Sequence, residues 1–193
     1  SYDAHCFSGG VGPSSLFEFE LAERGGIVYC YDASVSELPH PHDKVIFQKK
    51  FLGAIASENF TTLDHEMNDT KTQGSQNIIL KLDIEGAEYE VLLGMRPNII
   101  EKVRILVVEF HYLTNLFDPM SCKIINAVFE KLLKTHVIYN VQHNPTHRNN
   151  KKFGFKINRT LEFCFINKND NLILDRWDNR DLQVKNLSGS EKS

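Results

Sequence analysis

Short apolar runs alternate with segments of helical period along this chain, and the alternation limits the folds it can adopt. Residues 27–31 (Ile-Val-Tyr-Cys-Tyr) form a continuous run, as in a parallel strand buried on both faces. Further strands are expected at residues 5–7, 44–48, 77–83 and 103–110. Helices are expected at residues 16–22, from about 86 up to Pro97, and at 119–134. This order predicts an α/β fold, doubly wound around a mostly parallel sheet.

Two later strands, at residues 136–141 and 160–166, are close enough in sequence to predict a C-terminal antiparallel hairpin. No element is assigned to the polar residues 64–76. A chain of 193 residues with 41% hydrophobic content buries one sizeable core, so residues 1–167 are expected to form one domain. The charged residues 168–193 are expected to be a partly disordered C-terminal extension.

The charge and hydropathy of the chain limit the kinds of partner that we expect it to bind. The net charge is -3, without the basic excess that binding to a phosphate backbone requires, so no nucleic-acid partner is expected. No run approaches the roughly 18 apolar residues of a membrane span, so no membrane segment is expected in this chain. Because the chain starts without Met and soon reaches a glycine turn, we expect a longer protein ahead of Ser1. Compartment and oligomeric state stay open.

A glycine-rich turn, residues 9–15 (Gly-Gly-Val-Gly-Pro-Ser-Ser), joins the first expected strand to the first helix. Such a turn brings backbone amides close to a ligand, and an acid about 20 residues later can accept hydrogen bonds from ribose hydroxyls. Asp32 is that acid. Ser15 stands where a dinucleotide-binding turn has its third glycine, which makes a nicotinamide-binding oxidoreductase the weaker alternative. A glycine turn without a ligand is a further alternative.

The most specific segment is residues 81–94, Lys-Leu-Asp-Ile-Glu-Gly-Ala-Glu-Tyr-Glu-Val-Leu-Leu-Gly, which resembles the signature of the FkbM family of methyltransferases. Residues 62–64 upstream and 108–111 (Val-Glu-Phe-His) downstream match flanking elements of that family in the same order. The opening residues, 7–32, resemble a metazoan-type branch of FkbM-like proteins. The resemblance implies a class I, Rossmann-like methyltransferase fold and S-adenosyl-L-methionine as cofactor.

The resemblance also implies roles for individual residues. Gly10 and Gly12 would let the chain pass close to the methionine part of the cofactor, and Asp32 would hold the ribose hydroxyls. Gly53 would border the adenine. Asp83 would lie near the sulfonium, where a carboxylate stabilises positive charge and orients an acceptor hydroxyl. The acid that often starts the first motif of such enzymes is replaced by Ser8, so contacts to the methionine amino group are expected from backbone carbonyls.

Candidate bases or substrate-orienting groups are Asp83, Glu85, His111 and His143. Histidine suits the removal of a hydroxyl proton because its pKa lies near neutral. Each candidate has a structural alternative: Glu85, with Glu88, could cap the next helix, His111 could be a hydrogen-bonded core residue, and His143 could belong to a surface loop. Asp83, Glu85 and His111 could also ligate a divalent cation, but no metal is expected, and no C-x-x-C pair suggests zinc.

Taken together, the resemblance implies an S-adenosylmethionine-dependent methyltransferase that methylates a hydroxyl of a sugar or another small metabolite, so the partner expected is a small-molecule or glycan acceptor. The alternative is a non-catalytic module of the same fold that scaffolds a partner. Intact Gly10, Gly12, Asp32 and Asp83 argue against that alternative. The basic residues 148–152, with Lys156 and Arg159, are either a solvated loop or a flap over an anionic acceptor.

Overall fold

A central sheet of seven strands organises the computed structural model, which describes residues 3–69, 72, 75–143, 149–152 and 154–170. The strands are ordered β3-β2-β1-β6-β7-β11-β8. Their bounds are β1 (His5–Gly9), β2 (Ile27–Tyr31), β3 (Val45–Gln48), β6 (Ile78–Leu82), β7 (Val103–Phe110), β8 (His136–His143) and β11 (Leu161–Asn167). The first five strands in this order pair in parallel, whereas β11 is antiparallel to both β7 and β8. The predicted parallel sheet and C-terminal antiparallel pair are therefore confirmed.

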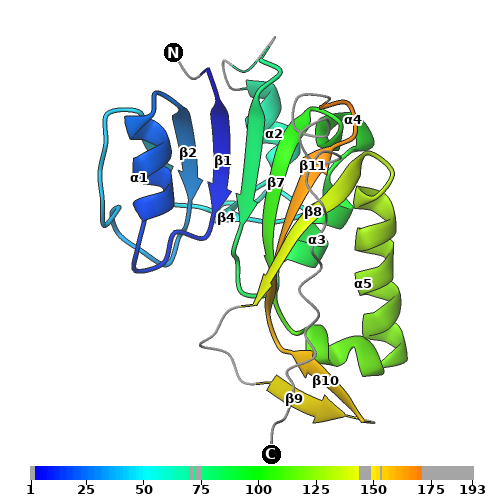
Figure 1. The fold of residues 1–193 in the computed structure, drawn as a ribbon. Helices are drawn as coiled ribbons and strands as arrows, with labels where there is room; N and C mark the ends of the chain where they lie inside the picture. The colour runs from blue at the N-terminus through cyan, green and yellow to red at the C-terminus, as the bar shows by residue number, and fades with distance from the viewer. Residues whose placement is uncertain (1–2, 70–71, 73–74, 144–148, 153, 171–193) are drawn as a thin grey trace, which may run out of the picture.

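Helices cover both faces of this sheet (Figure 1). They are α1 (Leu16–Glu23), α2 (Leu63–Asp69), α3 (Glu88–Gly94), α4 (Pro97–Ile100), α5 (Pro119–Leu132) and the 3-10 helix η1 (Leu113–Phe117). Because successive strand residues point to opposite faces, Cys6 and Val28 pack toward Leu21 of α1, while Phe7 and Tyr29 pack in the larger cluster that includes α2 to α5. The arrangement is doubly wound, as the alternation of elements predicts.

Five small elements, one helix and two strand pairs, lie where the sequence pattern predicts no helix or strand. Helix α2 occupies part of the polar segment 64–76; it buries Leu63 and Met67, a pair too sparse to show a helical period. Strands β4 (Phe51–Leu52) and β5 (Phe60–Thr61) form a separate parallel pair. Strands β9 (Asn149–Lys152) and β10 (Phe155–Asn158) form a hairpin inside the segment expected to be a loop. Elements of two to four residues carry too few positions for periodicity to reveal.

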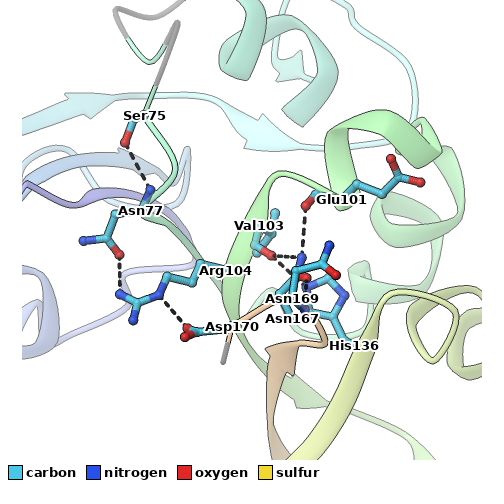
Figure 2. A network of polar contacts seen from close by, with 9 residues as sticks. All are labelled: Ser75, Asn77, Glu101, Val103, Arg104, His136, Asn167, Asn169 and Asp170. Carbon is cyan, nitrogen blue, oxygen red and sulfur yellow. Dashed lines mark hydrogen bonds and ion pairs between the residues drawn. The ribbon is translucent and has the colours of Figure 1, made fainter. Parts of the chain in front are cut away.

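A polar network closes the amino end of the sheet (Figure 2). The Arg104 side chain donates through Nε to Asp170 Oδ2 (2.6 Å) and through Nη1 to Asn77 Oδ1 (2.9 Å). Asn167 Nδ2 donates to the backbone oxygens of Glu101 and Val103, each at 3.0 Å. Asp170 is thus buried against the sheet, whereas Lys168 and Asn169 are exposed, and the rest of the expected C-terminal extension lies outside the described residues. No helix in the described part of the chain is long and apolar enough to span a bilayer.

Candidate functional site

A cavity of about 640 Å³ opens where β1, β2 and β6 end. Its wall combines backbone of the glycine turn, residues 10–14, with side chains that follow the strands, such as Asp32 after β2 and Asp83 after β6. The carboxyl ends of neighbouring parallel strands are where α/β sheets bind ligands, because the loops that follow the strands diverge there. The cavity therefore coincides with the edge at which the sequence places its candidate residues.

The glycine turn depends on its glycines. Gly10 and Gly12 have φ of 79° and 59°, in the left-handed region that residues with a Cβ rarely adopt. A Cβ on Gly10 would lie 1.7 Å from the backbone oxygen of Asp83, so this residue also permits the turn to pass directly against the end of β6. The turn thus keeps backbone groups at the surface of the cavity.

Asp32 holds this turn in place. Its Oδ2 accepts hydrogen bonds from the backbone N–H groups of Val11 (3.0 Å) and Gly12 (3.2 Å). Its Oδ1 accepts from the N–H (2.8 Å) and the hydroxyl (2.6 Å) of Ser34. Burial raises the pKa of Asp32, but the hydrogen bonds from Ser34, Gly12 and Val11 outweigh it and leave this pKa below its usual value. Asp32 is consequently a fixed anion on the cavity wall.

Gly53 lies beside the cavity and not on its wall. It borders a separate pocket of about 40 Å³, and a Cβ there would approach Phe60 Cδ1 to 3.0 Å. The large cavity is bordered instead by Phe51, Leu52 and Phe60 from the β4–β5 pair. The rings of Phe51 and Phe60 are 5.5 Å apart and tilted at 41°. No periodic signal singles these aromatic residues out, because each stands in a strand of two residues.

Asp83 and His111 meet because β6 and β7 are neighbouring parallel strands that end at the same edge. His111 Nε2 lies 3.9 Å from Asp83 Oδ1 and 3.6 Å from Glu85 Oε2. Its Nδ1 lies 2.8 Å from Oε1 of Glu88, a fully buried residue that also accepts from the backbone N–H groups of Ile84 and Gly86. A carboxylate is only an acceptor, so Nδ1 carries the proton and Nε2 faces the two other acids.

The pKa values of Asp83 and His111 in this cluster both lie above their usual values. Burial raises the pKa of Asp83 to about 6, with help from Glu109 and Glu85 and against the charges of Lys81 and His111. Burial lowers the pKa of His111, but the hydrogen bond to Glu88 and the charges of Glu88, Glu85 and Asp83 outweigh it, so this pKa lies above its usual value. A group that both takes up and gives up protons near operating pH suits acid–base chemistry.

Backbone strain is concentrated in the same two segments. Glu85 and Tyr112 adopt left-handed φ of 56° and 57°, a conformation that costs a residue with a Cβ roughly 1–2 kcal/mol. The Tyr112 ring covers Gly86, where an added Cβ would lie 2.6 Å from it. The guanidinium of Arg159 also lies over this ring, 4.8 Å from its centroid. Strain of this kind persists where the surrounding structure holds a functional geometry.

His143 ends β8 at the same edge but is exposed and is not among the residues that line the cavity. Its register partner Leu161 also pairs with Phe110, the residue before His111, so two strand spacings, about 10 Å, separate the two histidine backbones. Residues 144–148 of the expected loop lie outside the described residues. Within the described ranges, no group of three or more side chains could hold a metal ion.

Two glutamates, Glu88 and Glu18, make contacts that their positions in the sequence do not predict. From its position, Glu88 is a candidate only for capping the helix that it begins, yet its carboxylate also binds His111, 23 residues further along the chain. Glu18 lies within the first helix and reaches Ser8 and Lys81. Contacts between residues of different elements leave no trace in local spacing, so sequence reasoning missed both.

Comparison with known proteins gives a family and a fold. A family model described as the methyltransferase FkbM domain matches residues 28–155. Fibrillarin of Methanococcus jannaschii, described as a pre-rRNA processing protein, superposes with a TM-score of 0.52 at 11% identity over 86% of this chain and 66% of its own. The fibrillarin/NOP5P complex gives 0.51 at 10% identity over 86% and 72%. A search of curated proteins found no match.

A methyltransferase FkbM of Methylobacillus flagellatus is also similar, with a TM-score of 0.46 at 14% identity over 83% of this chain and 43% of its own. The chain spans about two thirds of the length of the Methanococcus fibrillarin and less than half of the Methylobacillus protein. The family model, however, covers more than half of the chain and includes the segment from Asp32 to His111. This chain belongs to the FkbM methyltransferase domain family and has the Rossmann-like α/β fold of class I methyltransferases.

Proposed function

We propose that this chain is an S-adenosylmethionine-dependent O-methyltransferase acting on a hydroxyl of a sugar or another small metabolite. The observation that carries the proposal is the buried His111–Glu88 pair next to Asp83, and Asp83 lines the cavity together with the glycine turn. When bound, S-adenosylmethionine would supply an electrophilic methyl group on its sulfonium. Membership of the methyltransferase family supports this chemistry.

The residues present fit the parts of this cofactor. The cavity volume of about 640 Å³ lies within the roughly 300–1,000 Å³ that ligand pockets usually have. Phe51, Leu52 and Phe60 offer an apolar wall suited to adenine. Asp32 offers an anion suited to ribose hydroxyls, but its oxygens already accept about four hydrogen bonds, the capacity of a carboxylate. A ribose hydroxyl would therefore take the place of the Ser34 hydroxyl on Oδ1.

The protein's own groups would prepare the acceptor. Glu88 keeps the proton on His111 Nδ1, so Nε2 is free to accept the proton of an acceptor hydroxyl. The buried negative charge of Glu88 then stabilises the imidazolium that results, as the acid of a catalytic triad does. Asp83, on the cavity wall and close to Nε2, is placed to accept a hydrogen bond from the same hydroxyl and so orient its oxygen.

The choice of a small acceptor rests on charge. Asp83, Glu85 and Glu109 concentrate negative charge at this edge, which disfavours a phosphate backbone. The fold itself does not support an exclusion of nucleic acid, because one similar structure is a pre-rRNA processing protein. RNA therefore belongs among the acceptors to be tested.

Transfer of a labelled methyl group from S-adenosylmethionine to a panel of glycans, small hydroxyl compounds and RNA tests the proposal. We expect methylation at a hydroxyl, with a rate about 10²- to 10⁴-fold lower in His111→Gln, the range general-base catalysis contributes. His65→Gln, at an exposed position of α2, serves as the matched control and should keep the wild-type rate. His143→Gln separates the two histidine candidates. Methylation confined to RNA, or an unchanged rate in His111→Gln, would contradict the proposal.

A further inference from the structure

Lys81 is the only cationic side chain among the described residues that line the cavity. It stands in β6, two residues before Asp83, on the sheet face covered by α1. Its Nζ lies 3.2 Å from the backbone oxygen of Gly10 and 3.2 Å from Glu18 Oε1, and its side chain is 18% exposed. The other charged groups on the wall, Asp32, Asp83 and Glu85, are all acids. A single cation is thus fixed against the glycine turn inside an acidic cavity.

Glu18 holds this cation from behind the cavity wall. Its side chain is 1% exposed, and Oε1 accepts from the hydroxyl of Ser8 at 2.5 Å as well as from Lys81. Its Oε2 is buried with no hydrogen-bond partner in the described structure. A buried carboxylate is costly unless it is paired, so Lys81 and Glu18 constrain each other strongly.

We propose that Lys81 binds the carboxylate of the methionine part of S-adenosylmethionine, and that Glu18 positions Lys81 for this contact. The inference rests on the proposed function. The carboxylate is the only anionic group of that cofactor, and Lys81 is the only described cation on the wall that can match it. An ammonium has three hydrogens. Two of them are directed to Glu18 and Gly10, which leaves the third for a ligand in the cavity.

Calorimetric titration with two ligands tests this contact without any activity assay: S-adenosylmethionine, and its decarboxylated analogue, which lacks only that carboxylate. We expect the wild-type protein to bind the analogue about 10- to 100-fold more weakly, the loss typical of one charged hydrogen bond. Lys81→Met should weaken binding of S-adenosylmethionine by a similar factor and should no longer distinguish the two ligands. Lys44→Met, which removes an exposed lysine outside the cavity, should behave as wild type.

The outcomes separate this inference from the proposed function. A folded wild-type protein that binds neither ligand would contradict the proposed function itself. Equal affinity of the wild type for both ligands, or undiminished discrimination in Lys81→Met, would overturn the role of Lys81 alone. Because Lys81→Met leaves Glu18 buried without its partner, the double variant Lys81→Met/Glu18→Gln provides a neutral version that is more readily folded. It should show the same loss of discrimination.

Discussion

The two ends of the central sheet both bury polar side chains, but they differ in the backbone conformation around those side chains. At the amino end, Arg104 forms an ion pair with Asp170 and a hydrogen bond with the Asn77 side chain, and the Asn167 amide donates to two backbone carbonyls. At the carboxyl end, Glu88 has an oxygen without a partner, and the backbone at Glu85 and Tyr112 is strained. Both ends are polar, and the carboxyl end surrounds the large cavity. A buried polar atom without a partner also occurs at the amino end, His5 Nδ1 in β1, so backbone strain is what distinguishes the carboxyl end.

The buried histidines of the two ends show the same contrast. His136 Nε2 lies 2.9 Å from the backbone oxygen of Val103, and burial lowers its pKa. Burial acts on His111 in the same direction, but three carboxylates reverse the shift and raise its pKa. One imidazole is therefore held neutral as part of the core, whereas the other can exchange a proton with a ligand.

The largest effect is expected for Gly10→Ala. The new Cβ would meet the backbone oxygen of Asp83 at 1.7 Å, so the turn must move and the cavity wall with it. We expect affinity for S-adenosylhomocysteine to fall by more than about 100-fold in calorimetry. Gly154→Ala is the matched control, because Gly154 also has a left-handed φ, 80°, but open space around its Cβ position. Undiminished affinity in Gly10→Ala would show that the turn is not part of the site.

Asp83→Asn should separate activity from stability. The carboxylate is lost from the acceptor position, so we expect the methylation rate to fall about 10²-fold or more. The melting temperature at pH 7 should be unchanged or slightly higher. The pKa of Asp83 is raised to about 6 in the folded protein, so the ionised carboxylate opposes folding above about pH 4, and the variant removes that charge. Solvent screening limits that gain to about 1 kcal/mol or less. A large loss of stability without loss of activity would assign Asp83 to the core and remove it from the site.

Arg104→Met should have the opposite profile. It removes the hydrogen bonds to Asp170 and Asn77 at the amino end, and we expect unfolding in urea to show a loss of about 1.5–3 kcal/mol. The methylation rate, measured well below the melting temperature, should stay within twofold of wild type, which is about 0.4 kcal/mol in barrier. A selective loss of activity would mean that the two ends are coupled.

The smallest expected effect is a difference between the pKa values of His111 and His136, which NMR of the imidazole nitrogens measures during a pH titration. His111 should titrate above the usual value of about 6.5 and His136 below it. His111 then stabilises the fold fully below that value and loses this contribution as pH rises through its own higher pKa. His136 costs stability as pH falls from about 6.5 toward its lower pKa. Reversed titration positions would remove the distinction between the two ends.

The sequence predicts the sheet better than it predicts the site. Runs of five to eight residues, such as β2 and β7, carry enough positions to reveal buried strands, and the order of elements then brings Asp83 and His111 to one edge. Spacing cannot show that Glu88 turns back to His111, or that Phe60 and not Gly53 borders the cavity. These contacts depend on the packing of distant elements and on backbone conformations that no local pattern encodes.

The proposed function requires that the carboxyl end of the sheet binds S-adenosylmethionine for methyl transfer. Calorimetric titration of S-adenosylhomocysteine into the wild-type protein and into Asp32→Ala tests it most directly, because Asp32 fixes the glycine turn through the amides of Val11 and Gly12. We expect micromolar binding by the wild type and none by Asp32→Ala, with an unchanged circular dichroism spectrum in the variant. A well-folded wild-type protein that does not bind, or equal binding by Asp32→Ala, would contradict it.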